Sequence, residues 1–240
     1  MNGLTQIQLT ELCHSIDLPA GATEAVLSTQ SSADFSSLLP SVLPLQDELL
    51  TPGTWDDALK RIKAFLGEDP LGMKILTFML LCSPKTWERY QELGISRAIF
   101  TETLKCFTRF INEHLESYGT FGFDRDFWTM RQLSARLFRL GTLEFELTED
   151  RGQKAVHVHI PSDADLSPQA RHRSYDMAQD FIARFFPDYG SAPFLCTSWL
   201  LSPALKECLP ESTTLQRNLK KYLLAGGRIG EAAGILDLHL

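Results

Sequence analysis

The sequence predicts an α+β protein, in which a helical first half precedes a mixed β-sheet with flanking helices. Apolar residues recur at helical spacing through most of residues 1–120. Residues 142–160 instead alternate between apolar and polar side chains, which indicates two half-buried strands joined by a turn. Overall, the second half follows the order helix, strand, strand, helix, strand, helix, strand, which is typical of sheets covered by helices. We therefore expect a helical domain over residues 1–120 and a sheet domain over 121–240.

The first predicted helix covers residues 5–16, where apolar side chains recur at helical spacing. The proline and glycine of residues 19–23 are expected to interrupt it, and the serine- and proline-rich segment 31–53 is expected to form short turns. Thr54 precedes two acidic residues and a periodic segment, as an N-cap does, and Gly67 follows the last turn. A second helix is therefore predicted between Thr54 and Gly67.

Three more helices are predicted in the first half. Pro70 suits the first position of a helix whose residues are apolar on nearly all sides, which indicates burial. Ser83 and Pro84 mark the start of the next helix, which ends at Gly94. Residues 96–118 have the pattern of one long amphipathic helix.

The second half begins with a helix that Asp124 is expected to cap and that should end near residues 136–138. A hairpin follows, because residues 142–147 and 155–160 alternate on either side of a turn. The remaining expected elements are a helix from Ser167 to Phe186, a strand over 193–201, a helix over 212–227 and a last strand over 234–240.

Composition and charge exclude several classes of function. With 44% hydrophobic and 22% charged residues, the chain has the composition of a soluble globular protein. Its formal net charge of −7 disfavours nucleic acid as a partner. No apolar run approaches the roughly 20 residues that span a bilayer, and the N-terminus lacks the pattern of a secretory signal. Scattered cysteines without a CxxC motif indicate reduced thiols. We therefore expect a cytoplasmic protein without a membrane partner, whose oligomeric state the sequence does not define.

Two histidines on one strand are the first candidates for chemistry. Alternation places His157 and His159 on the same face, whereas the hairpin register decides whether Glu144 and Glu146 on the neighbouring strand face them. Such a set could act as general bases, could bind a metal ion, or could consist of ordinary strand residues. No HExxH motif or Cys/His cluster adds ligands to the pair, so we expect no metal.

Cys196 and Ser198 are further candidates, since alternation places them on one strand face with Phe194. A thiol beside a histidine can act as a nucleophile, whereas a buried cysteine more often fills apolar space. No GxSxG motif occurs, which disfavours a hydrolase of that type.

The start of the predicted helix at Ser167 is a candidate anion site. Unpaired N–H groups and the helix dipole favour a negative ligand there, and Arg171 and Arg173 lie in the first two turns. Asp163 and Asp165 precede the helix and would repel a phosphate. The alternative is that these charges form a solvated surface.

Four segments taken together resemble a known family. In chain order they are "FRLGTLEFEL", "VHVHIPSDADLSPQARHRSYDMAQDF", "FPDY" and "FLCTSWLLSPALKECLPESTTLQRNL". Their order resembles bacterial acyltransferases that pair a helical N-acyltransferase N-terminal domain with a GNAT-like C-terminal domain. The resemblance is loose over residues 1–115 and closer over residues 120–240.

The resemblance implies an acyl-CoA or acetyl-CoA co-substrate and a small-molecule amine as acceptor. The cofactor would bind where two parallel strands splay apart, and a backbone N–H near His159 and Ile160 would polarise the thioester carbonyl. A general base would come from the four Glu and His residues named above, and Cys196 or Ser198 would lie near the departing sulfur. The residues that would bind the cofactor are Ile160, Ser162, Ser167, Arg171 and Arg173.

The loop between the strand and the helix departs from this family pattern. GNAT enzymes usually carry a Q/RxxGxG/A loop there, because glycines let the backbone wrap the pyrophosphate. Residues 161–173 contain no glycine. This departure favours an alternative function, a non-catalytic binding or interaction module on a degenerate GNAT-like scaffold.

Overall fold

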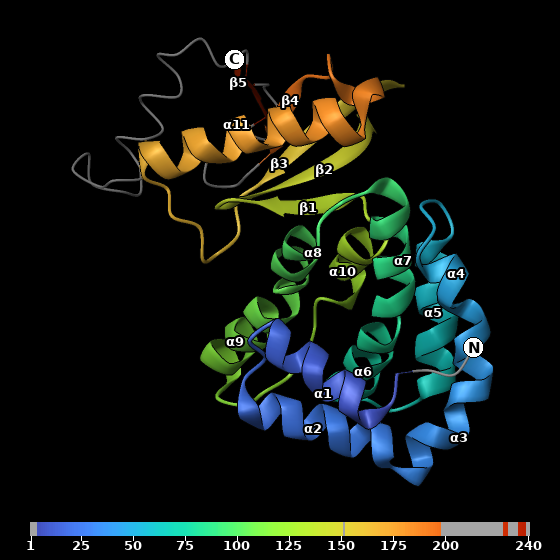
Figure 1. Cartoon of the computed structure of the whole chain (residues 1–240). Helices are drawn as coiled ribbons and strands as arrows, with labels where there is room; N and C mark the ends of the chain where they lie inside the picture. The colour runs from blue at the N-terminus through green and yellow to red at the C-terminus, as the bar shows by residue number, and fades with distance from the viewer. Residues whose placement is uncertain (1–3, 151, 198–227, 230–234, 239–240) are drawn as a thin grey trace. The chain divides into compact units, whose positions relative to one another are not determined.

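The chain divides into two compact units, Met1–Phe138 and Arg139–Leu240 (Figure 1). The first unit is helical, and the second contains most of a mixed sheet together with helix α11 (Pro168–Phe185). This arrangement confirms the predicted α+β fold class. No helix in the described part of the chain is long and apolar enough to cross a membrane. The computed structural model describes residues 4–150, 152–197, 228–229 and 235–238.

Helices dominate the described part of the first unit, and three of them match predicted helices closely. In chain order they are α1 (Gln6–Ser15), α2 (Ala20–Ser31), α3 (Ala33–Val42), η1 (Leu43–Leu45), α4 (Gln46–Leu49), α5 (Trp55–Leu66), α6 (Met73–Leu81), α7 (Ser83–Leu93), α8 (Arg97–Leu104), α9 (Cys106–Tyr118) and α10 (Asp126–Leu133). The predictions for α1, α5 and α7 are confirmed. Gly94 ends α7 in a left-handed conformation, as its position predicted.

Helix α6 is buried, as its apolar sequence predicted. All residues from Ile75 to Leu81 are buried. The helix begins at Met73 rather than at Pro70, because Gly72 takes a positive φ of 68° immediately before it. The Asp69 carboxylate accepts hydrogen bonds at 2.9 and 3.1 Å from two backbone N–H groups of the first turn, so it still caps the helix.

The expectation of short turns over residues 31–53 is wrong, since α3, η1 and α4 occupy most of this segment. Ser32 accepts a hydrogen bond from the N–H of Phe35 and caps α3. Similarly, the interruption expected at residues 19–23 is the start of α2, with Pro19 at its N-cap. Serine and proline therefore mark helix starts here rather than irregular structure.

The single helix expected over residues 96–118 is in fact two helices, α8 and α9, which meet at Lys105. The ψ angle of Lys105 is −8°, which makes a tighter turn than an α-helix. Its ammonium group pairs with Asp17 at 3.0 Å and with Glu102 at 2.9 Å. The apolar periodicity of the segment gives no sign of this local break.

The helix expected to end near residues 136–138 stops at Leu133. Ala135 takes a φ of 53°, a left-handed conformation that is unusual for a residue with a Cβ, and the chain turns there. Strand β1 (Leu137–Leu140) follows, and the sequence prediction missed it. Its short apolar run fits helical and strand spacing equally well.

Six strands form one sheet in the described part of the chain, in the order β1-β2-β3-β4-β6-β5. The predicted hairpin is confirmed as β2 (Leu143–Asp150) and β3 (Gln153–His159), which are antiparallel. β3 is parallel to β4 (Phe194–Thr197), whereas β6 (Ile235–Leu238) is antiparallel to both β4 and β5 (Arg228–Ile229). The strands expected near 193–201 and 234–240 are therefore present, while the helix expected over 212–227 lies outside the described residues.

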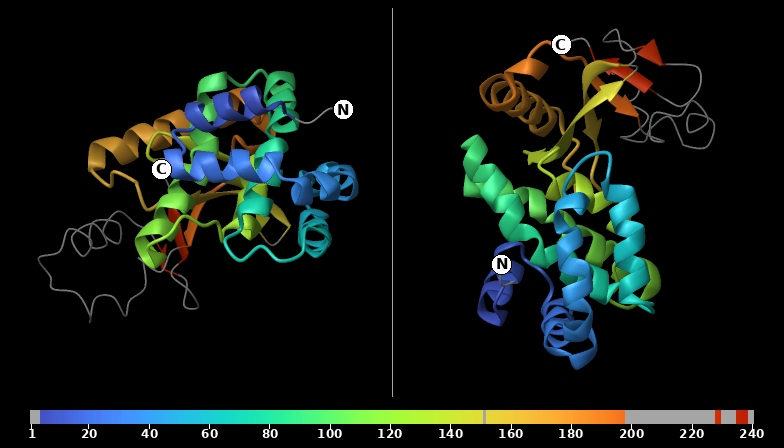
Figure 2. Two further views of the ribbon diagram at one scale, coloured as in Figure 1. Left: turned by 90° about the horizontal axis from the view of Figure 1, so that it is seen from below. Right: turned by 90° about the vertical axis from the view of Figure 1, so that its right-hand side faces the viewer.

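Helix α11 packs on one face of this sheet (Figure 2). The ring of Tyr175 lies 5.8 Å from that of Phe145 on β2 and 5.9 Å from that of Phe194 on β4, measured between centroids. Ser167 caps the helix through its side chain and Pro168 occupies the first helical position, as predicted. The opposite face of the sheet carries Glu144, Glu146, His157 and His159 of the hairpin.

Candidate active site

The hairpin register places four ionisable side chains on one face of the sheet. Glu144 lies opposite His159, and Glu146 lies opposite His157. Directly opposite residues of an antiparallel pair point to the same side, as do residues two apart on one strand. The register that the sequence left open therefore brings both glutamates to the histidines. The other face carries Phe145 and packs against α11.

Glu146 and His159 form a hydrogen-bonded pair that crosses the hairpin diagonally. The Nε2 atom of His159 lies 2.8 Å from Oε2 of Glu146. When the imidazole is neutral, Nε2–H donates to the carboxylate and Nδ1 is the basic nitrogen. The two side chains are 20% and 14% exposed, so the pair is partly shielded from water. An imidazole held by a carboxylate in this way can accept a proton from a reacting group.

His157 lies beside the Glu146–His159 pair, with its ring centroid 6.4 Å from that of His159. Burial lowers the pKa of His157 and the neighbouring His159 lowers it further, while Glu146 and Asp150 act in the opposite direction. At neutral pH, His157 is therefore held in its uncharged form more firmly than a solvent-exposed histidine. Glu144 belongs to the same face and is buried.

We expect an NMR titration of His157 to give a pKa below the usual histidine value of about 6.5. Because Glu146 raises this pKa, the variant Glu146→Gln should lower it further. The unfolded chain takes up the proton at a higher pH than the folded chain, so stability should decrease as the pH falls through about 6.5 towards the native pKa. His157→Gln should remove this part of the pH dependence. A raised pKa of His157 in Glu146→Gln would contradict the electrostatic account.

Strands β3 and β4 are parallel but pair over only part of their length. Pairing stops at His157 and Leu195, although the described parts of both strands run two residues further. Val156 donates its backbone N–H towards β4, to the carbonyl of Pro193 at 2.9 Å. Ile160 is the first residue beyond β3, and strand alternation continued to it would direct its N–H to the same side, where the pairing with β4 has ended. The end of β3 therefore presents a backbone donor where the two strands part.

The loop from β3 to α11 is held in place by its two aspartates. Arg139 donates to Asp163 at 3.0 Å and to the carbonyl of Gly141 at 2.9 Å. Asp165 accepts from the N–H of Ser167 at 2.8 Å and from its hydroxyl at 3.1 Å. Both carboxylates are thus engaged by the protein itself, which weakens the repulsion of an anion expected from the sequence. Sequence reasoning missed Arg139, because it lies on the strand β1 that was not predicted.

The first turn of α11 keeps few N–H groups for a ligand. Pro168 has none, the N–H of Ser167 is already bonded, and Ala170 donates to the Ser167 hydroxyl at 3.3 Å. Binding of an anion here would therefore depend on the side chains of Arg171 and Arg173. Among the predicted cofactor residues, the exposed ones are Ser162 and Arg173, and the half-buried ones are Ile160, Ser167 and Arg171.

Cys196 lies on the sheet face that packs against α11, since it is two residues from Phe194 on the same strand. It is therefore on the opposite face from the Glu146–His159 pair. Burial raises the pKa of the Cys196 thiol to about 11, so the thiol is protonated at neutral pH. This buried position favours the interpretation that Cys196 fills apolar space. Ser198 lies outside the described residues. Within the described ranges, no group of three or more His, Cys, Asp or Glu could hold a metal ion.

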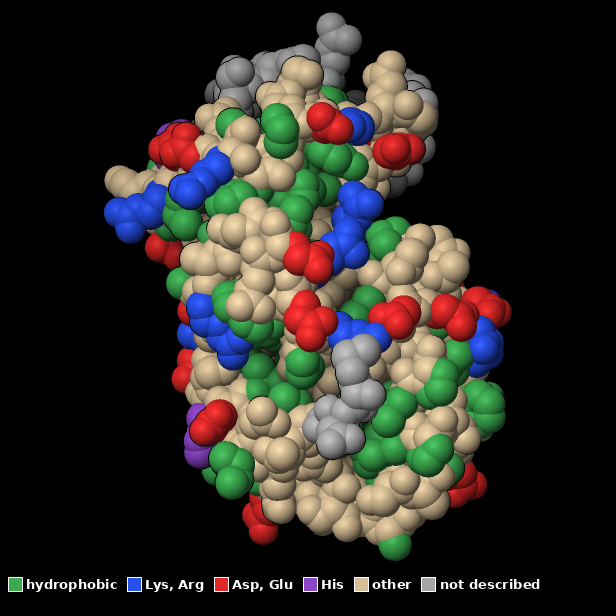
Figure 3. Space-filling model, turned by 45° about the vertical axis from the view of Figure 1, so that its right-hand side comes forward, with side chains coloured by type: hydrophobic (Ala, Val, Ile, Leu, Met, Phe, Trp, Pro, Cys, Tyr) green, Lys and Arg blue, Asp and Glu red, His purple; other side chains and the backbone are tan. Residues whose placement is uncertain are grey.

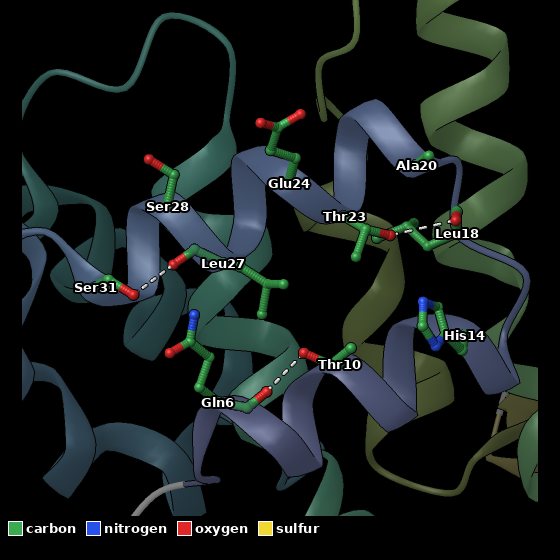
Figure 4. Close-up of a pocket in the computed structure, with 10 residues that line it drawn as sticks. All are labelled: Gln6, Thr10, His14, Leu18, Ala20, Thr23, Glu24, Leu27, Ser28 and Ser31. Atoms are coloured by element: carbon green, nitrogen blue, oxygen red, sulfur yellow. Dashed lines mark hydrogen bonds between the residues drawn. The ribbon is translucent and has the colours of Figure 1, made fainter.

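A groove of about 510 Å³ lies between α1 and α2 in the helical unit (Figure 4). Hydroxyl groups line part of its wall, and three of them are bonded to nearby backbone. The hydroxyls of Thr10, Thr23 and Ser31 each donate to a backbone carbonyl four or five residues earlier. The groove therefore has less hydrogen-bonding capacity than its composition suggests, and we assign it no ligand.

A helical unit followed by a mixed sheet with a parted parallel strand pair and one capped helix defines an acyltransferase fold with a GNAT-like second domain. Residues 7–135 match the model of the N-acyltransferase N-terminal domain, and residues 137–213 match that of the GNAT-like C-terminal domain. The chain belongs to the family that these two domains define. Among curated proteins, none matches the chain.

Solved acyltransferase structures share this fold. One, a crystal structure of an acyltransferase in complex with decanoyl-CoA and teicoplanin, is 20% identical, with a TM-score of 0.74. Another, an acyltransferase mutant in complex with octanoyl-CoA, is also 20% identical, with a TM-score of 0.75. Each alignment covers 97% of this chain and 72% of the other. At this identity, the similarity shows that the fold is shared.

Proposed function

We propose that this protein transfers an acyl group from acyl-CoA to the amine of a small molecule. The observation that carries the proposal is the parting of β3 and β4 beside the Glu146–His159 pair. A carbonyl placed at the end of β3 would meet a backbone N–H on one side and a proton acceptor on the other. The aminolysis of a thioester needs both groups: a donor that stabilises the carbonyl oxygen and an acceptor for the proton of the amine.

The proposed donor site uses backbone at the end of β3 and side chains of the following helix. The N–H of Ile160 would donate to the thioester carbonyl oxygen, which gains negative charge in the transition state. Arg171 and Arg173 would bind the phosphates of CoA, because the first turn of α11 has few N–H groups left for them. Ser162 and Ser167 would add hydroxyl contacts to the same phosphates.

The proposed reaction forms one amide bond and breaks one thioester bond. The amine nitrogen attacks the thioester carbon, and His159 takes its proton while Glu146 stabilises the resulting imidazolium. The carbon–sulfur bond then breaks, and the CoA thiolate leaves with a proton from the same imidazolium or from water. The products are an N-acylated acceptor and free CoA.

The acceptor class is proposed from the similar structures. One of them holds both decanoyl-CoA and teicoplanin, a small molecule compared with a protein substrate. We therefore propose a small-molecule amine as acceptor and a medium-chain acyl group as the transferred group for this chain as well.

A two-stage screen tests the proposal. Purified protein is first scanned for thermal stabilisation by acetyl-CoA, octanoyl-CoA, decanoyl-CoA and CoA, and ligands that bind the folded state should raise the midpoint. Release of free CoA thiol is then followed with a panel of small-molecule amines. We expect stabilisation by at least one acyl-CoA and amine-dependent thiol release. Stabilisation by none of them, together with no thiol release, would rule the proposal out.

The closed first turn of α11 favours one other function, a non-catalytic binding or interaction module on a GNAT-like scaffold. In such a module Ser167 and Asp165 would complete the helix end permanently instead of leaving room for a pyrophosphate. Such a module predicts that acyl-CoA raises the thermal midpoint without release of CoA thiol, or that it does neither. Amine-dependent thiol release that Glu146→Gln abolishes would decide against it.

A further inference from the structure

Basic side chains of the helical unit are commonly paired with carboxylates. Arg61 lies 2.6 Å from Glu48, and Lys74 lies 2.7 Å from Asp34. On the face shown in Figure 3, several Lys and Arg side chains likewise lie beside Asp or Glu. Such pairing is expected in a half of the chain that holds more acidic than basic residues.

Arg89 on α7 and Arg136, just beyond α10, depart from this rule. In the part of the chain that the structure describes, neither forms an ion pair with a carboxylate. The Nε atom of Arg136 is buried and has no hydrogen-bond partner there. Glu92 acts on Arg89 from nearby along α7 but does not pair with it. Both guanidinium groups are therefore left to bind something else.

The fold brings these two arginines together. The hydroxyl of Thr86 donates to the carbonyl of Leu133 at 2.8 Å, which joins α7 to the end of α10. Arg89 lies one helical turn beyond Thr86. Arg136 lies three residues beyond Leu133, after the left-handed turn at Ala135. Burial lowers the pKa of Arg89 and the positive charge of Arg136 lowers it further, as expected for two cations near one another.

A buried amide lies at the same end of α10. Gln132 is fully buried, and neither its Oε1 nor its Nε2 atom has a partner in the described part of the chain. Leaving a buried polar group without a hydrogen-bond partner is costly, so native interiors rarely keep several of them. The unsatisfied groups of Gln132 and Arg136 are therefore best explained by a polar ligand that completes their hydrogen bonds.

We propose that Arg89 and Arg136 form a binding site for a small oxyanion, a phosphate or carboxylate group, in the helical unit. Two adjacent guanidinium groups present planar forks of N–H donors, which match the oxygen atoms of either group. A bound anion also removes the repulsion between the two cations. The site lies wholly within the first unit and is independent of the acyl transfer proposed above.

The test is a titration of the full-length protein with inorganic phosphate and, separately, with acetate. Chloride keeps the ionic strength constant, and the readouts are the NMR signals of the arginine Nε–H groups and the thermal midpoint. We expect saturable shifts of the Arg89 and Arg136 signals with at least one of the two anions. Binding of phosphate alone identifies a phosphate group as the ligand, and binding of acetate alone identifies a carboxylate.

Three variants make the test specific. Arg89→Gln and Arg136→Gln should each weaken the apparent affinity at least fivefold, whereas Arg61→Gln, which removes a cation already paired with Glu48, should leave it unchanged. Without anion, Arg89→Gln relieves a repulsion, so its midpoint should not fall below that of Arg61→Gln. The proposal is overturned by the absence of saturable shifts, by an equal loss in Arg61→Gln, or by a markedly lower midpoint in Arg89→Gln without anion.

Discussion

Replacing Glu146 with glutamine should reduce the turnover number of acyl transfer about 100-fold, the lower end of what a general acid–base group contributes. An amide at this position keeps the shape of the side chain but cannot stabilise the imidazolium that His159 becomes when it accepts a proton. The KM for acyl-CoA should change little, because the groups proposed to bind it lie at the end of β3 and on α11. Initial rates of thiol release with the best donor and acceptor from the screen measure both constants.

Two further variants show whether Glu146 acts through His159. His159→Asn should cause a similar loss, and the double variant should be little worse than either single one, since the two residues act as a unit. Glu149→Gln is the matched control, because this exposed residue lies on the same strand but alternates to the other face. Full turnover in both Glu146→Gln and His159→Asn would exclude the pair as the proton acceptor.

Only part of this candidate site could be predicted from the sequence. Alternation placed His157 and His159 on one face, because the side-chain period of a strand is fixed. It could not show whether the glutamates face them, since a register shift of one residue reverses the answer. The bond from Glu146 to His159 depends wholly on that register.

The β3–α11 loop illustrates another limit of sequence reasoning. Asp163 and Asp165 counted as charges that would repel a phosphate, because a sequence shows charges without their partners. The structure pairs Asp163 with Arg139, which is 24 residues away, and bonds Asp165 to the capping residue Ser167. A loop without glycine can therefore still be well defined, although it offers an anion fewer backbone N–H groups.

Some local capping signals predicted helix ends, although Arg125 and not Asp124 stands at the N-cap of α10, and Thr54 precedes α5 without a capping side-chain hydrogen bond. Ser167 with Pro168, and Gly94, marked ends that the structure confirms, since each acts through the backbone nearest to it. The break at Lys105 and the turn at Ala135 had no comparable signal. Alanine favours helices, so its left-handed conformation at residue 135 must be imposed by tertiary packing.

Replacing Gly72 with alanine should cost the helical unit about 3 kcal/mol or more of unfolding free energy. Gly72 has a φ of 68°, and a left-handed conformation costs a residue with a Cβ about 1–2 kcal/mol. The added Cβ would also lie only 1.9 Å from the backbone oxygen of Phe123. That oxygen cannot easily retreat, because the N–H of Phe123 is bonded to the carbonyl of Leu71 at 2.8 Å. Urea denaturation monitored by circular dichroism measures the loss.

Gly94→Ala separates the two causes of that loss. Gly94 has nearly the same backbone conformation, with a φ of 73°, but a Cβ added there would meet nothing within 4 Å. It should therefore cost only the left-handed conformation, about 1–2 kcal/mol. The excess loss in Gly72→Ala then measures how rigidly the segment around Phe123 is held against the start of α6. Equal losses in the two variants would mean that this segment yields to the added methyl group and does not constrain the chain at Gly72.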